Sequence, residues 1–211
     1  MRTSWPALLL LVLAPACEKT APEPAPQRAP SATPKSESVD PVLPPAASAS
    51  RRPACRIPMS EAPPAAPRFK VDPKCPADPS GGSPMVPVGH VSFPESKDAP
   101  RLEVELMLTN EHQERGLMYR KSLADDKGML FAWPSPSVHT FWMHNTCIPL
   151  DMLFIDRDGF IAGIVENAPT LNDEGRSVAC PVDYVLEVNA GWSRSHGVAP
   201  GQHVNIEGMP R

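Results

Sequence analysis

The sequence predicts a mostly β domain, a compact antiparallel β-sandwich or barrel with one or two short helices, preceded by a disordered proline-rich tether. A series of short apolar runs follows residue 100, and turn residues end each run. The runs do not alternate with helical segments, as they would in a parallel sheet. Most of the 29 prolines lie before residue 100, so the folded part is shorter than the 211-residue chain. A formal net charge of -4 gives no basic footprint for nucleic acid.

Residues 1–16 have the organisation of an export signal. Arg2 precedes the apolar run WPALLLLVLAPA, which is too short to span a bilayer and ends in small residues before Cys17. This arrangement resembles a bacterial lipobox, so we predict cleavage before Cys17 and a lipid on its sulfur that binds the membrane. The alternative is an ordinary secretory signal with a coincidental cysteine. Because Glu18 rather than Asp follows Cys17, we expect the outer membrane, with the protein facing the periplasm.

Three segments follow the signal. Residues 17–54 are rich in Pro, Ala and Ser and cannot bury enough apolar surface to fold, so we interpret them as a tether. Residues 55–99 stay proline-rich but contain large apolar side chains and two cysteines, which favours an extension laid along the domain. We expect the β-domain itself to occupy residues 100–211.

Four further cysteines indicate disulfides. An even number in an exported chain is typical of a disulfide framework, and Cys55, Cys75, Cys147 and Cys180 allow three connectivities. Proximity in sequence favours Cys55–Cys75 and Cys147–Cys180. Four free thiols are the alternative. No two of them have the C-x-x-C spacing of a zinc site.

The first predicted strand is RLEVELMLT, residues 101–109, in which Leu and Val alternate with Glu and Thr. Asn110 can then cap a short helix, EHQERGLM, with Gln113 at the capping-box position. Gly116 weakens this helix, and Gly128 begins the next strand, GMLFAW.

The clearest hairpin is LDMLFIDRDGFIAGIVEN, where Asp158-Gly159 separates two apolar runs. The segment SVHTFWMHNT precedes it. YVLEVNAG predicts another strand, WSRSHG a helical turn that ends at Gly197, and HVNIEGM a last strand.

The stretch FWMHNTCIPLDMLFID, residues 141–156, is the densest in residues that can do chemistry. Met143 and His144 are copper ligands in other settings. Neighbours in a strand point to opposite faces, however, so we predict no metal site and no cofactor. Cys147 is a candidate nucleophile, but a disulfide with Cys180 would quench it.

Three carboxylates, Asp151, Glu166 and Glu187, lie in or beside apolar runs. Such groups are rarely buried unless they are paired, and Arg115 and Arg120 are natural partners. A pocket that holds a ligand or moves a proton is the functional interpretation. The alternative is that each carboxylate lies at a solvated strand face or pairs structurally with an arginine.

Aromatic residues can form the base of a sugar- or peptide-binding groove, where their rings stack on the ligand. In strands they more often belong to the core. Trp142 is the exception to test, because alternation places it with Thr140 and His144.

Six motifs together resemble the "domain of unknown function 192" family, also catalogued as uncharacterised protein family 0127. In order, they are ERGLMYRKSL, GMLFAWPSP, FWMHNTCIPLDMLFID, IVENAPTL, YVLEVNAG and HGVAPGQHV. The resemblance covers about Leu102 to Ile206. It implies a compact, mostly β domain of jelly-roll or sandwich type, often behind a signal or anchor. It implies no established activity, and His144 stands where the family commonly carries Lys or Arg.

Our first hypothesis is a lipid-anchored envelope protein whose β-domain binds a ligand or envelope partner without catalysis. The alternative is a hydrolase of glycan or peptide bonds that uses Asp151, Glu187 or Glu166 as acid and base. A third interpretation is that the motifs only determine the fold. The candidate ligand-binding residues are Arg115, Arg120, Trp142, Asn145, Asp151, Glu166 and Glu187.

Overall fold

The structure, a computed structural model, describes residues 55–62, 64–65, 67 and 70–210. The predicted signal peptide, the lipidation of Cys17 and the tether lie outside the described residues. Within them, the chain forms strands and two short helices, and no helix has the length and apolar character needed to cross a bilayer. In chain order, the elements are β1 Val88–Ser92, β2 Leu102–Met107, α1 Asn110–Arg115, β3 Lys127–Ser137, β4 Phe141–Met143, β5 Leu150–Ile155, β6 Ile161–Ala168, β7 Asn172–Arg176, β8 Val182–Asn189, α2 Trp192–Ser195 and β9 Asn205–Glu207.

Seven strands form one sheet in the order β6-β5-β8-β3-β2-β1-β9, and β4 pairs with β7 in a second, small sheet. The mostly β prediction is confirmed. The strand pairs of the described residues are antiparallel except for one, because β2 and β3 run parallel. A parallel pair needs a crossover of about a dozen residues or more, and α1 with the loop after it provides one.

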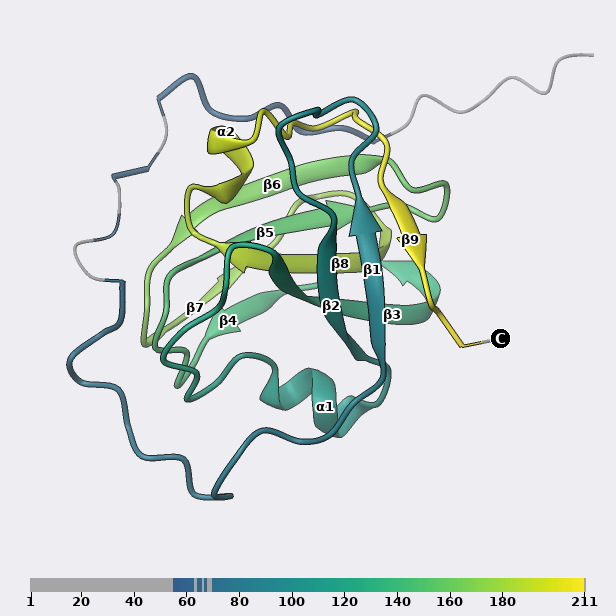
Figure 1. Cartoon of the computed structure of the whole chain (residues 1–211). Coiled ribbons are helices and arrows are strands. Elements are labelled where there is room, and N and C mark those ends of the chain that lie inside the picture. The colour runs from purple at the N-terminus through teal and green to yellow at the C-terminus, as the bar shows by residue number, and fades with distance from the viewer. Residues whose placement is uncertain (1–54, 63, 66, 68–69, 211) are drawn as a thin grey trace, which may run out of the picture. The chain divides into compact units, whose positions relative to one another are not determined.

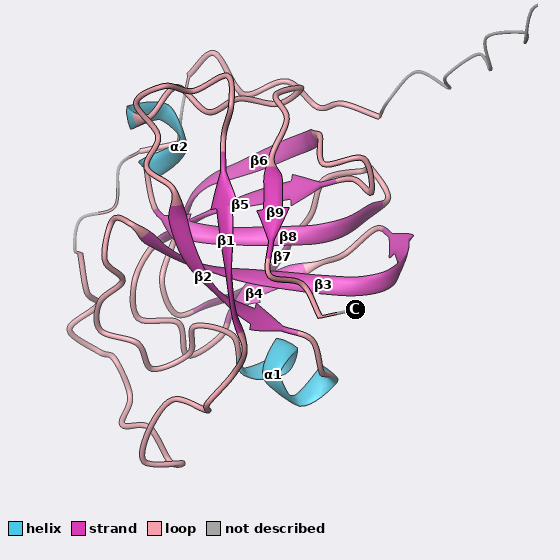
Figure 2. Cartoon of the chain, turned by 45° about the vertical axis from the view of Figure 1, so that its right-hand side comes forward, coloured by secondary structure: helices cyan, strands magenta, loops and turns pink. Residues whose placement is uncertain are grey.

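The large sheet bends until its two edges meet. In both views β1 crosses in front of β5 and β8, and Figure 2 shows β9 beside it (Figures 1 and 2). Phe160 forms a bridge with His203, the amide of Ile161 donates to the carbonyl of Gln202 over 3.0 Å, and the amide of Val204 donates to Gly159 over 2.8 Å. These bonds join the start of β6 to the segment before β9, which closes the sheet into a barrel.

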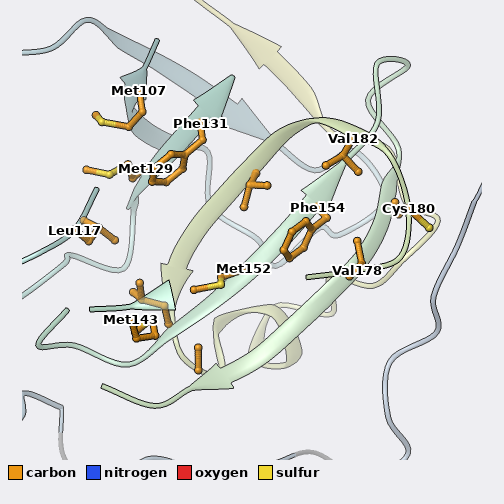
Figure 3. Close-up of a cluster of buried hydrophobic side chains, with 14 of the residues drawn as sticks. Met107, Leu117, Met129, Phe131, Met143, Met152, Phe154, Val178, Cys180 and Val182 are labelled. Atoms are coloured by element: carbon orange, nitrogen blue, oxygen red, sulfur yellow. The ribbon is translucent and has the colours of Figure 1, made fainter. Parts of the chain in front are cut away.

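Each face of the sheet packs against its own hydrophobic core. The barrel interior contains Val104, Leu130, Leu153 and Leu186, and Trp192 packs against them. The outer core covers β3, β5 and β8, and it is rich in Met and Phe side chains (Figure 3). Because strand residues alternate between faces, neighbours along β8 belong to different cores.

Helix α1 begins differently from the prediction. The hydroxyl of Thr109, not Asn110, caps the helix by accepting from the amide of His112. Gln113 makes no capping box. Its side-chain amide donates to the carbonyls of Met107 and Ala132 instead, which ties the helix to β2 and β3. Gly116 ends the helix at φ 47° and ψ -135°, a conformation that glycine alone adopts readily.

The extension before residue 88 lies along the outer core, where Val71 and Val86 pack. The segment predicted as extension also supplies β1, so the sheet begins before residue 100. The predicted cysteine pairing is wrong: the disulfides are Cys55–Cys180 and Cys75–Cys147. The extension runs past the domain without folding on itself, so each of its cysteines meets a cysteine of the domain.

Candidate functional site around Glu187 and Trp142

Glu187 is a buried carboxyl with no ion-pair partner in the part of the chain that the structure describes. It lies near the end of β8, where the register places it between Met129 of β3 and Met152 of β5. These methionines belong to the outer core (Figure 3). Only 4% of Glu187 is exposed, and among the described residues no side chain or amide donates to it. Burial raises the pKa of Glu187 to about 8, because water cannot solvate its charged form.

The arginines expected beside the carboxylates bind other partners. Arg115 donates to Asp78 of the extension over 2.6 Å and lies over the Tyr119 ring. Arg120 donates to Glu105 over 2.7 Å. Neither arginine therefore neutralises Glu187, and the predicted pairing with this residue is wrong.

A narrow slot of about 30 Å³ leads to Glu187 from the surface. The last residues of α1, with Gly116 and Met118, form one wall, and Phe131, Phe141 and Trp142 form another. A Cβ added at Gly116 would lie 3.3 Å from Cζ of Phe131. Glycine therefore lets the end of the helix approach the aromatic wall.

Trp142 stands at the mouth of this slot. It is 51% exposed, unusually high for a large apolar side chain, and its ring stacks on His144 at 4.9 Å. A groove of about 370 Å³ lies on one side, with Trp133 and Phe141, and one of about 580 Å³ on the other, with Tyr119. Slot and grooves therefore share one wall.

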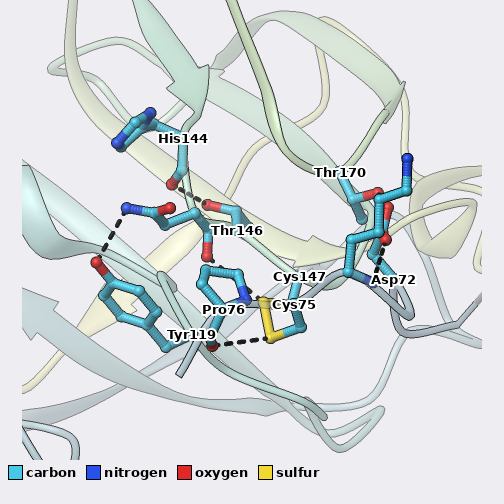
Figure 4. The surroundings of a disulfide bond; sticks show 10 residues. Asp72, Cys75, Pro76, Tyr119, His144, Thr146, Cys147 and Thr170 are labelled. Atoms are coloured by element: carbon cyan, nitrogen blue, oxygen red, sulfur yellow. Dashed lines mark hydrogen bonds between the residues drawn. A yellow bond between two sulfur atoms is a disulfide. The ribbon is translucent and has the colours of Figure 1, made fainter. Parts of the chain in front are cut away.

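Asn145 supports the site rather than lining it. Its φ of 51° is left-handed, a conformation in which asparagine is the most tolerated residue after glycine. Its side-chain amide donates to the Tyr119 hydroxyl over 2.9 Å, and its carbonyl accepts from the Tyr119 amide (Figure 4). The neighbouring Cys75–Cys147 disulfide binds the extension to the same turn. Asn145 thus fixes the turn after β4 and, with it, Trp142.

Asp151 lies on the opposite face of the sheet from Glu187. It is fully buried, and its carboxylate accepts from the amides of Asn167, Gly191 and Ser193 at 2.9 to 3.0 Å. The side chain joins β6 to the first residues of α2. Its acceptor positions are occupied by the backbone, which indicates a structural role.

Glu166 also has a structural partner, the guanidinium of Arg194. It binds the guanidinium of Arg194 through both carboxylate oxygens, and Arg194 donates as well to the carbonyl of Ser60. A hydrolase that used two of these carboxylates would need both on one cavity, on the order of 5–10 Å apart. Asp151, Glu166 and Glu187 do not share such a cavity, so the geometry does not favour that alternative.

Other candidates fall outside the site. Met143 is fully buried while His144 is partly exposed and pairs with Asp173, so they do not share a metal. Cys147 is in a disulfide and is not a nucleophile. A cavity of about 720 Å³ lies beside the extension, and the Asn189 side-chain amide that lines it already donates to the carbonyl of Leu123.

The sequence did not point to Glu114 or Tyr119. Glu114 lines the slot and both grooves, and Tyr119 lines one groove and binds Asn145. Both lie in the ERGLMYR motif, so their place in that motif was the available signal.

Comparisons agree with this architecture. A crystal structure from Sinorhizobium meliloti, described as a proposed transcription regulator, is 38% identical, with a TM-score of 0.57 over 61% of this chain and 100% of that one. A protein of unknown function from Novosphingobium aromaticivorans is 33% identical, with a TM-score of 0.51 over 67% of this chain and 99% of that one. Among proteins with curated descriptions, none matches. The model of the DUF192 family, described as an uncharacterized ACR, matches residues 93–206, more than half of the chain. The chain therefore belongs to the DUF192 family.

Proposed function

We propose that this protein is a cell-envelope lipoprotein, anchored through Cys17, whose β-domain binds a ligand or an envelope partner without catalysis. The binding surface is the Trp142 groove, by which we mean the slot to Glu187 and the two grooves beside it. The N-terminal signal and the lipobox-like residues before Cys17 support the location. Two disulfides fit an oxidising compartment.

The observation that carries the binding proposal is the buried Glu187 carboxyl, which has no hydrogen-bond partner among the described residues, beneath an exposed tryptophan. A buried polar group without a hydrogen bond costs free energy, so proteins rarely keep one that has no use. An exposed tryptophan with a polar group beside it is typical of recognition surfaces, because the ring gives a large rigid contact area. Together the two residues form an apolar concave site with a few polar groups, as binding sites generally are.

Binding can be tested with defined probes rather than extracts. We expect one class among envelope glycan fragments, short peptides and alkylamines to shift the NMR signal of the Trp142 indole and quench its fluorescence. Trp142→Ala should weaken that binding at least tenfold, measured by calorimetry because the indole signal is lost in this variant. Val138→Ala removes another side chain that is about half exposed and should leave binding unchanged. No response from any class, or equal losses in both variants, would overturn the binding proposal.

The location has a separate test. In a bacterial host that processes lipoproteins, the wild-type chain should fractionate with membranes and gain the mass of a lipid. Cys17→Ser should remove both properties without unfolding the domain. Equal fractionation of the two chains would contradict the anchor.

The regulator description belongs to the Sinorhizobium protein. DNA binding needs a basic surface, and the formal net charge of -4 here does not provide one. We therefore do not propose a nucleic-acid partner.

A further inference from the structure

We propose that the slot beneath Trp142 binds a primary ammonium group at the end of an alkyl chain, with the Glu187 carboxylate as its counter-ion. Lysine side chains and free alkylamines carry such a group. This inference rests on the proposed function, because it names the ligand class of the same site.

The first argument is charge. Glu187 is almost completely buried, and it lines the slot. Arg115 is the cation in the described lining, and Asp78 already binds it at 2.6 Å. A buried carboxylate keeps its charge when hydrogen-bond donors or a cation accompany it; Asp151 has three amides, and a ligand ammonium would supply the cation for Glu187.

The second argument is size. A cavity needs roughly 10–15 Å³ of this kind of volume to hold one water molecule. The slot, at about 30 Å³, therefore accepts a head group about the size of two or three waters. An ammonium group fits. A guanidinium plane, a sugar ring or an acetamido group would need the walls to move apart.

The third argument is the chemistry of the walls. Phe131, Phe141 and Trp142 line the slot, and the Phe131 and Phe141 rings meet edge to face at 5.0 Å. The faces of aromatic rings attract cations. Glu114 lines the slot and both grooves, which adds negative charge at the mouth. The apolar side chain of Met118 lines both the slot and the groove with Tyr119, where an alkyl chain can contact it.

A hydroxyl group is the competing occupant of the same size. The charged groups that face Glu187 are Glu114 and Arg115 from α1, while β3 and β5 place Met129 and Met152 beside it and β4 contributes aromatic rings. Burial keeps the free carboxyl protonated at neutral pH. An ammonium must displace that proton, whereas a hydroxyl can accept a hydrogen bond from it. The two occupants therefore predict opposite responses to pH.

The test compares 1-aminopentane with 1-pentanol, which differ only in the head group. Each would be titrated by NMR and calorimetry into the full chain, with its disulfides intact, between about pH 6 and pH 9. We expect the amine affinity to rise about tenfold per pH unit up to about pH 8 and then to level off. Calorimetry in buffers of different ionisation enthalpy should show one proton released per amine bound near pH 6.

Two variants complete the design. Glu187→Gln should weaken amine binding at pH 8 at least tenfold and abolish its pH dependence. Glu114→Gln, the control at the mouth, should cost at most about threefold because solvent screens its charge. The histidines of the grooves, His112 and His139, are unchanged in both variants, so a pH response that survived Glu187→Gln would belong to them.

Three results would overturn the inference: equal affinities for amine and alcohol, amine affinity that does not change with pH, or amine affinity that rises toward low pH. If other probes still shifted the Trp142 indole, the binding proposal would stand with another ligand class. If nothing bound in the Trp142 groove, the proposed function itself would fail.

Discussion

Asp151 and Glu187 are buried carboxyl groups on adjacent strands, one residue apart in register. Met152, next to Asp151, pairs with Glu187, so the two carboxyls point to opposite faces of the sheet. Their exposed fractions are 0% and 4%. Three backbone amides bind Asp151, and no described residue donates to Glu187. Burial is therefore the same in both places, and only the partners distinguish a structural carboxyl from a candidate binding group.

The largest expected effect on stability tests the structural role of Asp151. Asp151→Ala leaves one buried and two partly buried amides without an acceptor, and a buried donor without a partner costs about 1–3 kcal/mol. We expect a loss of at least ~3 kcal/mol in the free energy of unfolding, measured in urea, and a smaller loss for Asp151→Asn. If Asp151→Ala were as stable as the wild type, Asp151 would have no structural role, and it would no longer differ from Glu187 in this respect.

Glu187 should instead make the free energy of unfolding depend on pH. Its folded pKa of about 8 lies above the ordinary value of 4.5, so the folded state holds an extra proton between them. The stability from this proton is complete below about pH 4.5 and is lost as the pH rises through 8, by at most about 1.4 kcal/mol per unit. Glu187→Gln should remove this slope in urea unfolding between about pH 5 and pH 9. A slope unchanged by the substitution would assign it to another group.

Gly116 tests the wall of the slot. Gly116→Ala forces a side chain into a φ of 47° and against Phe131, so we expect a loss of about 1–3 kcal/mol. Gly197→Ala is the control, because Gly197 also has a positive φ but has open space around it. Equal losses, measured by thermal unfolding, would mean that contact with Phe131 is unimportant.

Trp142 should matter least for stability. Because about half of its surface is exposed, Trp142→Ala should change the free energy of unfolding by no more than about 0.5 kcal/mol. Trp192, 2% exposed, is the matched control, and Trp192→Ala should cost about 3–5 kcal/mol. Similar losses in the two variants would place Trp142 in the core rather than at a binding surface.

The sequence predicted the elements whose apolar residues alternate or cluster. Residues 102–107, the hairpin around Asp158-Gly159 and the strand through Glu187 all form as expected. Strand β7, with the sequence Asn-Asp-Glu-Gly-Arg, escaped prediction because it lies partly exposed in a two-stranded sheet and has no apolar face. β1 was missed because it reads as part of the proline-rich extension.

Partners far apart in sequence were the hardest to predict. The apolar runs around Asp151 and Glu187 identified both as unusual, but nothing local showed which would be satisfied. Asp78 removes Arg115 from the carboxylates through an extension whose path depends on tertiary contacts. The same path decided the disulfides, where proximity in sequence was misleading.

The Cys55–Cys180 bond also determines how the domain bears load. Any pull on the chain before Cys55 enters the domain at this covalent bond and passes to Cys180, two residues before β8 begins. The hydrogen bonds of the extension therefore carry little of that force. Further along the chain, the Cys75–Cys147 disulfide holds the extension beside the turn of Asn145. The ion pair between Asp78 and Arg115 is therefore kept in place. If residues 17–54 act as the tether that the sequence predicts, the Trp142 groove would thus keep its shape under tension.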